Sequence, residues 1–384
     1  MPHGKILLMT PGPTLVDSEV LLELARATIN HVSDEFDSIH LGVVNNLKKI
    51  FGTSGDLIVL PGSGTSAMEL ALRSVVKRGS KVLVLKTGYF AGYLADGVRY
   101  LEGSPEIVES ELGKGFDGNL LDRIIEKHRD VDVIAFQHVD TSTSVANPVS
   151  ELAKVEGDWG LRAVVDGVAS IGGMEMEMDK WGVDVCFTGS QKALGVPPGL
   201  GIVAFGSRFS QELDESSSLS LYFNIPKLRR EMQSTKNYYI TPAVNLVYGL
   251  AKSINNILEE GLENRYKRHR IMAEAVRGAA EKTGLKLVAK EGFQADTVTA
   301  IYLPEGVIWP DLYRSMKAKG VEIAGGLGEL KGKIFRIGHM GQVGYNEIIA
   351  TIAALERSLR ELGYPTELGT AISHVQQILA GYGN

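Results

Sequence analysis

Two charged side chains lie directly beyond apolar, strand-sized runs in the middle of the chain. Asp166 follows the run 162–165, and Lys192 follows the run 183–187 after four small or polar residues. Taken singly, Asp166 is typical of a helix N-cap and Lys192 of a solvent-exposed loop lysine. Taken together, they offer an amine that can form a Schiff base and a carboxylate that can hold a proton on a neighbouring ring nitrogen.

A glycine-rich turn lies upstream of this pair. The apolar run 57–60 leads into Pro-Gly-Ser-Gly-Thr at 61–65, and a helical pattern follows at 66–76. A strand, a glycine turn and a helix N-terminus present free backbone N–H groups and a positive dipole end to an anion such as phosphate. The hydroxyls of Ser63 and Thr65 add two more donors. The turn therefore predicts a phosphate site.

The same turn also satisfies the G-x-G-x-x-A pattern of dinucleotide-binding proteins, through Gly62, Gly64 and Ala67. That fold expects an acidic residue at the end of the next strand, about 20 residues on, to hold the ribose. The next apolar run, 81–85, is followed by Lys86 instead. Half of the fingerprint is present, and an ordinary tight turn explains this motif equally well when it is taken alone.

Pyridoxal 5'-phosphate (PLP) requires an amine, a carboxylate and an anion site together. Lys192 would form the Schiff base, Asp166 would pair with the pyridinium nitrogen so that the ring stays an electron sink, and the turn would grip the phosphate. Both charged residues lie at strand ends, where ligands of open α/β sheets bind. We therefore predict a PLP enzyme in which the amino substrate displaces Lys192, whose freed amine then acts as general base and acid.

The elements that must position these residues alternate between strands and helices. Amphipathic segments such as 66–76 and 118–127 separate the earlier apolar runs. This alternation predicts an α/β fold with a mostly parallel sheet covered on both faces, because parallel strands need crossover connections. The runs are 57–60, 81–85, 131–136, 162–165, 183–187 and 201–205.

The C-terminal third has a different pattern. One long helical pattern runs from Asn245 through Ala275, contains a strongly basic stretch at 265–270, and predicts a helix that connects two domains. Shorter strand and helix patterns follow it and predict a small α+β domain; they lie at 298–303, 310–319, 334–337 and from Tyr345 onward. We expect an N-terminal arm (1–13), a large PLP-binding domain (14–260) and a small C-terminal domain (261–384).

Composition excludes several other classes of function. The net charge of −6 and the lack of a long basic run argue against nucleic acid as a partner. Cys186 is the one cysteine, so no intrachain disulfide is possible. No run approaches the ~20 apolar residues of a membrane helix, and the N-terminus lacks a signal-peptide pattern. The eight histidines form no metal-binding pair. We expect a cytoplasmic protein without a metal ion.

At Gly189-Ser190-Gln191-Lys192-Ala193-Leu194 and Pro197-Pro198-Gly199, the sequence resembles the class V aminotransferases of PLP fold-type I, specifically the alanine:glyoxylate and serine:pyruvate group. The resemblance spans nearly the whole chain. Its other motifs, in order, are Pro-Gly-Pro at 11–13, Gly-Ser-Gly-Thr at 62–65, Val-Asp-Gly-Val-Ala-Ser at 165–170, Thr-Pro at 241–242 and Phe-Arg-Ile-Gly-His-Met-Gly at 335–341.

The resemblance implies roles for individual residues. Around the cofactor, it implies that Phe90 stacks on the ring and that Ser142, in the polar loop 138–144, supplies a hydroxyl beside the ring. Many relatives carry His in place of Thr65 and Trp in place of Phe90, so this chain departs from the pattern at both positions. The implied phosphate contacts are Ser63, Gly64, Thr65 and Gln191 from the same chain, and Tyr238 and Thr241 toward the neighbouring subunit of a homodimer with shared sites.

Arg336 matches the arginine that binds the substrate carboxylate, a task suited to the bidentate guanidinium, and Gly12 matches a substrate-side position. The sequence places no second arginine in the pocket for a dicarboxylate. The resemblance therefore implies an aminotransferase that moves an amino group from serine or alanine to pyruvate or glyoxylate.

Other functions remain to be distinguished. A phosphonate aminotransferase, a lyase or an epimerase can use the same scaffold, and a non-catalytic PLP-binding module is the alternative from another class. A cysteine desulfurase is disfavoured because Cys186 lies within an apolar strand, where a thiol is buried and unreactive.

Overall fold

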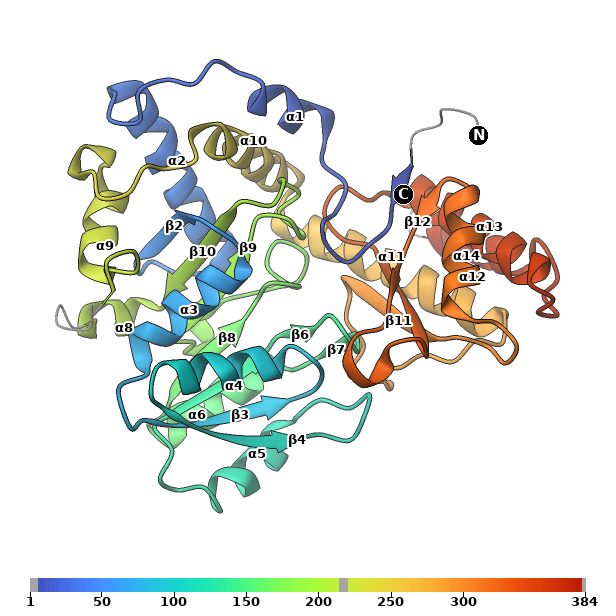
Figure 1. Cartoon of the computed structure of the whole chain (residues 1–384), viewed down its shortest axis with the longest axis horizontal. Helices are drawn as coiled ribbons and strands as arrows, with labels where there is room; N and C mark the ends of the chain where they lie inside the picture. Colours follow the sequence, from blue (N-terminus) through green and yellow to red (C-terminus); the bar gives the residue numbers. More distant parts are fainter. Residues whose placement is uncertain (1–5, 214–219, 382–384) are drawn as a thin grey trace.

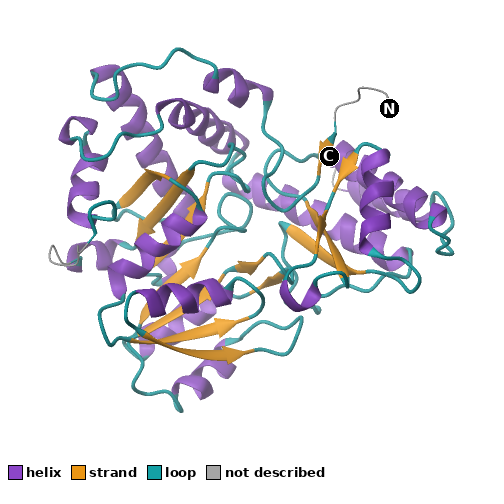
Figure 2. Cartoon of the chain, viewed as in Figure 1, coloured by secondary structure: helices purple, strands orange, loops and turns teal. Residues whose placement is uncertain are grey.

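The computed structural model describes residues 6–213 and 220–381 and shows two parts side by side (Figure 1). The larger part contains a seven-stranded sheet and the smaller a three-stranded sheet, and helices pack outside the strands of both (Figure 2). Each part has its own hydrophobic core. One core uses residues between Val20 and Ile257, and the other uses Met9 with residues between Ile271 and Leu379.

The large sheet has the strand order β2-β10-β9-β8-β5-β3-β4. β10 is antiparallel to both of its neighbours, and the other described pairings in this sheet are parallel. The carboxyl ends of all strands except β10 therefore meet at one edge, and the predicted, mostly parallel α/β sheet is confirmed. The strands are β2 (Leu57–Pro61), β3 (Lys81–Lys86), β4 (Ser104–Glu109), β5 (Val133–Gln137), β8 (Arg162–Asp166), β9 (Val185–Gly189) and β10 (Leu200–Phe205).

Burial explains why most of these strands could be predicted. β5, β9 and β10 are buried along their whole length, and strands covered on both faces have continuous apolar runs. β4 was not predicted. Its sequence, SPEIVE, is largely exposed or half-buried, and it lies at the sheet edge beside β3. An edge strand can remain polar, so it lacks the apolar signal.

Helices cover the large sheet. α3 packs on β9 and β10, α4 on β3 and β4, and α6 on β8. Within the described residues, no helix is long and apolar enough to cross a membrane. The helices of this part are α1 (Ser18–Leu24), α2 (Asp34–Phe51), α3 (Gly64–Val75), α4 (Ala91–Tyr100), α5 (Gly118–Ile125), α6 (Val149–Asp158), α7 (Met178–Trp181), α8 (Ser207–Glu212), α9 (Ile225–Gln233) and α10 (Val244–Glu260). A short hairpin, β6 (Val139–Asp140) and β7 (Val145–Ala146), and the turn η1 (Thr235–Asn237) complete it.

The smaller part is α+β, as predicted. Its sheet is antiparallel, in the order β11-β14-β13, and the N-terminal strand β1 pairs with β12 in parallel. The elements are β1 (Leu7–Leu8), α11 (Leu262–Lys282), β11 (Val298–Tyr302), α12 (Trp309–Ala318), β12 (Val321–Glu322), β13 (Ala324–Gly325), η2 (Gly328–Leu330), β14 (Ile334–Gly338), α13 (Tyr345–Glu361) and α14 (Thr370–Gly381).

The single helix predicted from Asn245 through Ala275 is wrong. α10 ends at Glu260, and α11 begins at Leu262. Gly261 separates them with φ +82°, a conformation that glycine adopts far more readily than other residues. The break lets α10 stay packed on α1 and α2 while α11 leaves to pack on α14 in the smaller part (Figure 1).

Candidate active site

The carboxyl edge of the large sheet brings the predicted residues together. Ser63 follows β2, Asp166 ends β8, and Lys192 lies beyond the end of β9. All three line a cavity of about 280 Å³. Its described lining is Ser63, Gly64, Thr65, Met68, Phe90, Tyr93, Val139, Thr141, Asp166, Val168, Phe187, Gln191 and Lys192.

Lys192 is a partly buried lysine whose amine is held in the site. Its Nζ donates a hydrogen bond to the carbonyl oxygen of Pro11. Burial, together with the positive charge of Arg336, lowers the pKa of Lys192 to about 8, although Asp166 opposes the shift. The amine therefore becomes neutral, and nucleophilic, nearer to physiological pH than an ordinary lysine.

Gly12 lies directly against this side chain. It has φ +132°, and a Cβ at this position would lie 2.5 Å from Cε and 2.9 Å from Nζ of Lys192. Both the backbone conformation and the space require glycine here. Gly12 thus lies against the Lys192 side chain, although it is not among the described residues that line the cavity.

Asp166 is the last residue of β8 and is buried. No helix begins beside it in the described chain, so it is not an N-cap, although its Oδ1 accepts a hydrogen bond from the Val168 N–H at 2.9 Å. Burial raises the pKa of Asp166 to about 7; the Val168 N–H opposes this shift, Asp140 adds to it, and Lys192 opposes it. A cationic ring nitrogen beside Asp166 would favour the ionised carboxylate.

The glycine-rich turn, where the anion site was predicted, lies at the N-terminus of α3. The Ser63 hydroxyl accepts a hydrogen bond from the Thr65 N–H at 3.3 Å, and the Ser66 hydroxyl accepts one from the Ser63 N–H at 2.9 Å. Because the Ser63 oxygen acts as an acceptor here, its own proton stays available to a ligand. Gly62 has φ +157°, and a Cβ there would lie 2.1 Å from the Ser66 hydroxyl.

Gln191 adds a polar group that the protein itself leaves unsatisfied. Its Oε1 is buried and has no hydrogen-bond partner in the described part of the chain. Buried polar atoms normally have partners, so this unpaired amide oxygen, an acceptor, indicates a ligand that donates a hydrogen bond. The acceptors of Gln191 and Asp166, together with the Ser63 hydroxyl and the N-terminus of α3, fit PLP.

Phe90 brings an aromatic ring to the cavity from the N-terminus of α4. Its ring packs edge-on against Tyr89, with centroids 5.5 Å apart, and lies 5.8 Å from the ring of Tyr93. Its backbone N–H donates to Asp140 at 3.2 Å. The implied stacking residue therefore faces the cavity with its loop fixed by a buried carboxylate.

Ser142 is not among the residues that line this cavity. Its hydroxyl donates to Asp140 Oδ1 at 2.6 Å and accepts from the Tyr89 N–H at 2.9 Å. It lines a neighbouring cavity of about 370 Å³. The adjacent Thr141 lines the cavity of Lys192. The hydroxyl expected from Ser142 is thus engaged in holding its own loop, and Thr141 is the residue of this pair that lines the cavity of Lys192.

Arg336 reaches the site from β14 of the smaller part. Its Nε donates to the Gly325 carbonyl at 2.8 Å and its Nη1 to the Thr141 carbonyl at 3.0 Å. Burial lowers the pKa of Arg336 to about 10, and the nearby Asp140 opposes this shift. Nη2 has no acceptor among the described residues. A guanidinium fixed at two of its nitrogens in this way is pre-oriented behind the cavity wall.

Tyr238 and Thr241 lie outside the cavity of their own chain. The two side-chain oxygens are 3.0 Å apart, and Tyr238 is 52% exposed. Sequence patterns also missed several apolar members of the cavity wall: Met68, Tyr93, Val139, Val168 and Phe187. Their types are common in any core, so only the fold distinguishes them.

Comparison with known proteins places this chain in a family. The family model described as aminotransferase class-V matches residues 17–330. An uncharacterised aminotransferase of Methanocaldococcus jannaschii is 37% identical and is matched over 94% of both chains. The serine–glyoxylate aminotransferase of Arabidopsis thaliana is 32% identical over 96% of this chain and 94% of its own. The crystal structure of ureidoglycine–glyoxylate aminotransferase from Bacillus subtilis superposes with a TM-score of 0.93, at 28% identity, over 100% of both chains.

Proposed function

Because the chain belongs to the class-V aminotransferases, enzymes that move amino groups between amino acids and 2-oxo acids, we propose that it does so with PLP held on Lys192. The observation that supports this most strongly is the convergence of four groups from different segments on one cavity. An amine, a buried carboxylate, an anion-binding turn and an aromatic ring line it together. PLP, when bound, supplies an electron sink that stabilises negative charge at the substrate Cα.

The residues around the cavity would bind the cofactor and transfer protons. The Ser63 hydroxyl and the N-terminus of α3 would bind the phosphate, and the NH2 group of the Gln191 side chain would add a donor. Asp166 keeps the ring nitrogen protonated. Thr141, and not the implied Ser142, lines the cavity. Phe90, which lines the cavity, would pack against the ring and help to exclude water. The Lys192 amine removes the proton from the substrate Cα and returns it during the reaction.

The charge of the cavity indicates a small monocarboxylic substrate. Lys192 is the one cationic residue in its described lining, and Arg336 stands directly behind Thr141. One guanidinium binds one carboxylate bidentately, and a dicarboxylate would require a second cation. We therefore propose serine or alanine as the donor and glyoxylate or pyruvate as the acceptor. Glyoxylate is the acceptor in the names of both relatives above whose substrates are stated.

The exposed Tyr238–Thr241 pair supports a homodimer with shared sites. A tyrosine and a threonine that bond to each other on the surface can present both hydroxyls to the phosphate of a second subunit. Large apolar residues are also exposed, Leu22 on α1 at 71% and Leu221 before α9 at 87%, and subunit contact would remove them from water.

A donor and acceptor panel tests the proposed reaction. Purified protein loaded with PLP should convert alanine or serine to its oxo acid only once per site without an acceptor, and repeatedly once glyoxylate or pyruvate is added, since transfer is ping-pong. Ammonia release from serine without an acceptor would indicate a lyase, and a D-amino acid product an epimerase. A protein that binds PLP but changes no substrate would be a binding module.

The pKa of Asp166 predicts how PLP affinity depends on pH. This carboxyl has a pKa raised to about 7 in the protein without cofactor, and PLP pairs with its ionised form. Affinity should therefore be full above pH 7 and fall as the pH drops below 7, by up to about tenfold per pH unit, because a proton must first be expelled. Asp166→Asn removes this dependence and weakens binding ~100-fold at pH 8, as expected when one partner of a buried pair is lost.

The measurement is the PLP dissociation constant from pH 5.5 to 8 for both proteins, followed by fluorescence quenching. Protonation of the phosphate affects both proteins equally. Asp166 also raises the pKa of Lys192, so both proteins carry Lys192→Ala in this measurement, and the ratio of the two constants then isolates Asp166. The dissociation constant of the Asp166→Asn protein divided by that of the protein with Asp166 should become smaller as the pH falls. A ratio that stays constant across pH 7 would contradict the assigned role.

Cysteine desulfurase chemistry finds no support in the site. Cys186 is fully buried and is the second residue of β9. Burial raises the pKa of its thiol well above the usual value, and the negative charge of Asp166 raises it further. A thiol that stays protonated and inaccessible cannot act as a nucleophile.

A further inference from the structure

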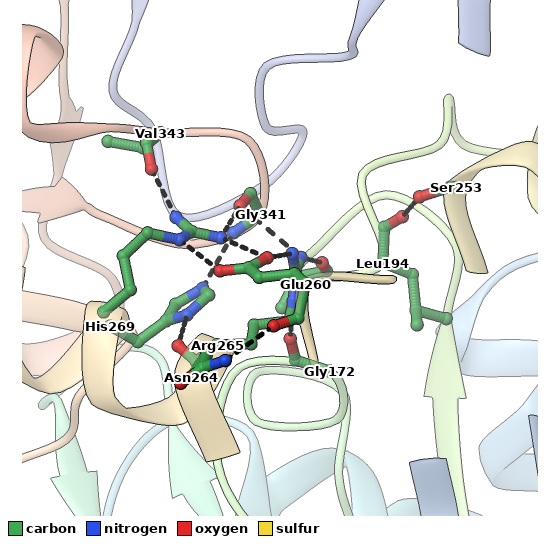
Figure 3. A network of polar contacts seen from close by, with 11 residues as sticks. Gly172, Leu194, Ser253, Glu260, Asn264, Arg265, His269, Gly341 and Val343 are labelled. Carbon is green, nitrogen blue, oxygen red and sulfur yellow. Dashed lines mark hydrogen bonds and ion pairs between the residues drawn. The ribbon is translucent and has the colours of Figure 1, made fainter. Parts of the chain in front are cut away.

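The basic stretch at 265–270 does not form one solvated surface. It lies on α11, and its first arginine, Arg265, has a side chain only 1% exposed, whereas Arg270 five residues later is 63% exposed. Figure 3 shows Arg265 enclosed by backbone carbonyls and by Glu260. Burial of a guanidinium is strongly unfavourable unless its donors are paired and hydrogen-bonded. The position therefore requires an explanation beyond solubility.

Arg265 donates to three carbonyls from three different loops. Its Nε donates to Gly172 at 2.5 Å, and its Nη2 to Ala193 at 2.7 Å and to Gly341 at 3.4 Å. Its Nη1 donates to the Glu260 carboxylate at 2.8 Å. All three nitrogens of the group are thus occupied, in a fixed planar arrangement that lysine could not reproduce.

Each of these loops follows a residue of the proposed active site. Ala193 is the residue after Lys192. Gly172 lies in the segment that leaves β8 beyond Asp166. Gly341 lies just beyond the strand that contains Arg336. One side chain therefore connects the backbones of the amine, the ring carboxylate and the substrate guanidinium, although Arg265 itself is absent from the described cavity lining.

Neighbouring side chains strengthen the same junction. Glu260 Oε1 accepts from Arg268 Nε at 2.6 Å, and Arg268 Nη1 donates to the Val343 carbonyl at 2.6 Å. His269 accepts the Gly341 N–H through Nε2 at 3.1 Å. On the large-part side, the Ser253 hydroxyl of α10 donates to the carbonyl of Leu194 (Figure 3). The loops of Lys192 and Arg336 are thus joined through the α10–α11 corner.

We propose that Arg265, paired with Glu260, is a positioning residue that sets the distance between the Lys192 loop and the Arg336 segment. This inference rests on the proposed transaminase function. The smaller part contributes Arg336 and the larger part Lys192, so the substrate meets both only if the two parts hold one relative placement. A displacement of about 1 Å in a reacting group can lower a rate ~100-fold.

The test compares Arg265→Met with Arg270→Met, a control of the same substitution on the exposed side of the same helix. In stopped-flow experiments, the PLP-loaded protein is mixed with a series of alanine concentrations, which gives the maximal rate of the amino half-reaction and the apparent dissociation constant separately. Arg265→Met should lower the maximal rate ~100-fold, and Arg270→Met should leave it within about twofold.

Hydrogen–deuterium exchange of the cofactor-free proteins gives a readout that does not depend on activity. The amides of Gly195 and Gly341 are bonded to the Lys192 carbonyl and to His269. In Arg265→Met, peptides that contain these two amides should exchange about tenfold faster, since one net hydrogen bond corresponds to about that factor. Peptides from β3 and β5 should not change. Uniformly faster exchange would indicate general destabilisation and overturn the proposal.

Two further proteins keep the test decisive. Ile254→Val in the core of α10 controls for lost stability, and it should retain the maximal rate. If Arg265→Met does not fold, Arg265→Lys keeps the charge without the planar fork and should still lower the rate about tenfold. An unchanged maximal rate in the folded Arg265 variant overturns the proposal. If the wild-type protein itself shows no half-reaction with any amino donor, the proposed function fails instead.

Discussion

Replacement of Lys192 by alanine should lower kcat at least ~10³-fold, because the variant loses both the covalent anchor of the cofactor and the general base at the substrate Cα. The fold should remain, since the Lys192 side chain belongs to neither hydrophobic core of the described chain. Steady-state transamination of alanine with glyoxylate measures the effect, and thermal unfolding confirms that the protein is folded.

Lys180→Ala is a matched control, because Lys180 lies on the short helix α7 and is exposed. Borohydride reduction followed by mass spectrometry gives a second readout. The wild-type and control proteins should retain one covalently bound PLP on the peptide that contains Lys192, and Lys192→Ala should retain none. Repeated turnover by Lys192→Ala at a near-normal rate would exclude this lysine as the catalytic group.

Replacement of Arg336 by methionine should raise the KM for alanine by ~100-fold or more, because truncation of one partner in a buried charge pair costs about 2–5 kcal/mol. Arg336→Lys should recover little, since lysine cannot donate to Gly325, Thr141 and a carboxylate in one plane. Arg314→Met on the exposed face of α12 serves as the control.

Ethylamine, which is alanine without its carboxylate, separates carboxylate binding from general damage. The wild-type protein should prefer alanine strongly over ethylamine, and Arg336→Met should lose most of that preference. Preserved discrimination would mean that another group binds the carboxylate. The substitution also removes the positive charge that lowers the pKa of Lys192, so the lysine pKa should rise above 8 and the rising limb of the pH–rate profile should move to higher pH.

The parts of the site that depend on strand ends could be predicted from the sequence. Ser63, Asp166 and Lys192 each follow a continuous apolar run, and the parallel sheet places the carboxyl ends of those runs at one edge. The family and its fold, both implied by resemblance, are confirmed by the comparisons. The domain boundaries and the individual ligand contacts remain predictions.

The other features of the site depend on loop conformation, which sequence patterns do not predict. Thr141 and Ser142 are adjacent hydroxyl residues, and no pattern indicates which one faces the cavity. The structure distinguishes Thr141 from Ser142 because Asp140 accepts a hydrogen bond from the Ser142 hydroxyl. Ser144 adopts φ +61° where the loop closes. The burial of Arg265 could not be predicted from the sequence for a different reason. The stretch that it begins also contains Lys267, Arg268 and Arg270 and has the composition of a solvated surface, and only the three surrounding loops show that Arg265 is buried.

The pairing of β1 with β12 affects the order in which the chain can assemble during synthesis. Leu7 lies beside Val321, and the segment that follows β1 reaches the Lys192 amine through Pro11. β1 can therefore pair with β12 only after most of the polypeptide has left the ribosome. The larger core can collapse earlier, since domains generally fold as units from the N-terminal side. The wall around Lys192 is completed last, so a nascent or truncated chain that already has the larger core is not yet a competent catalyst.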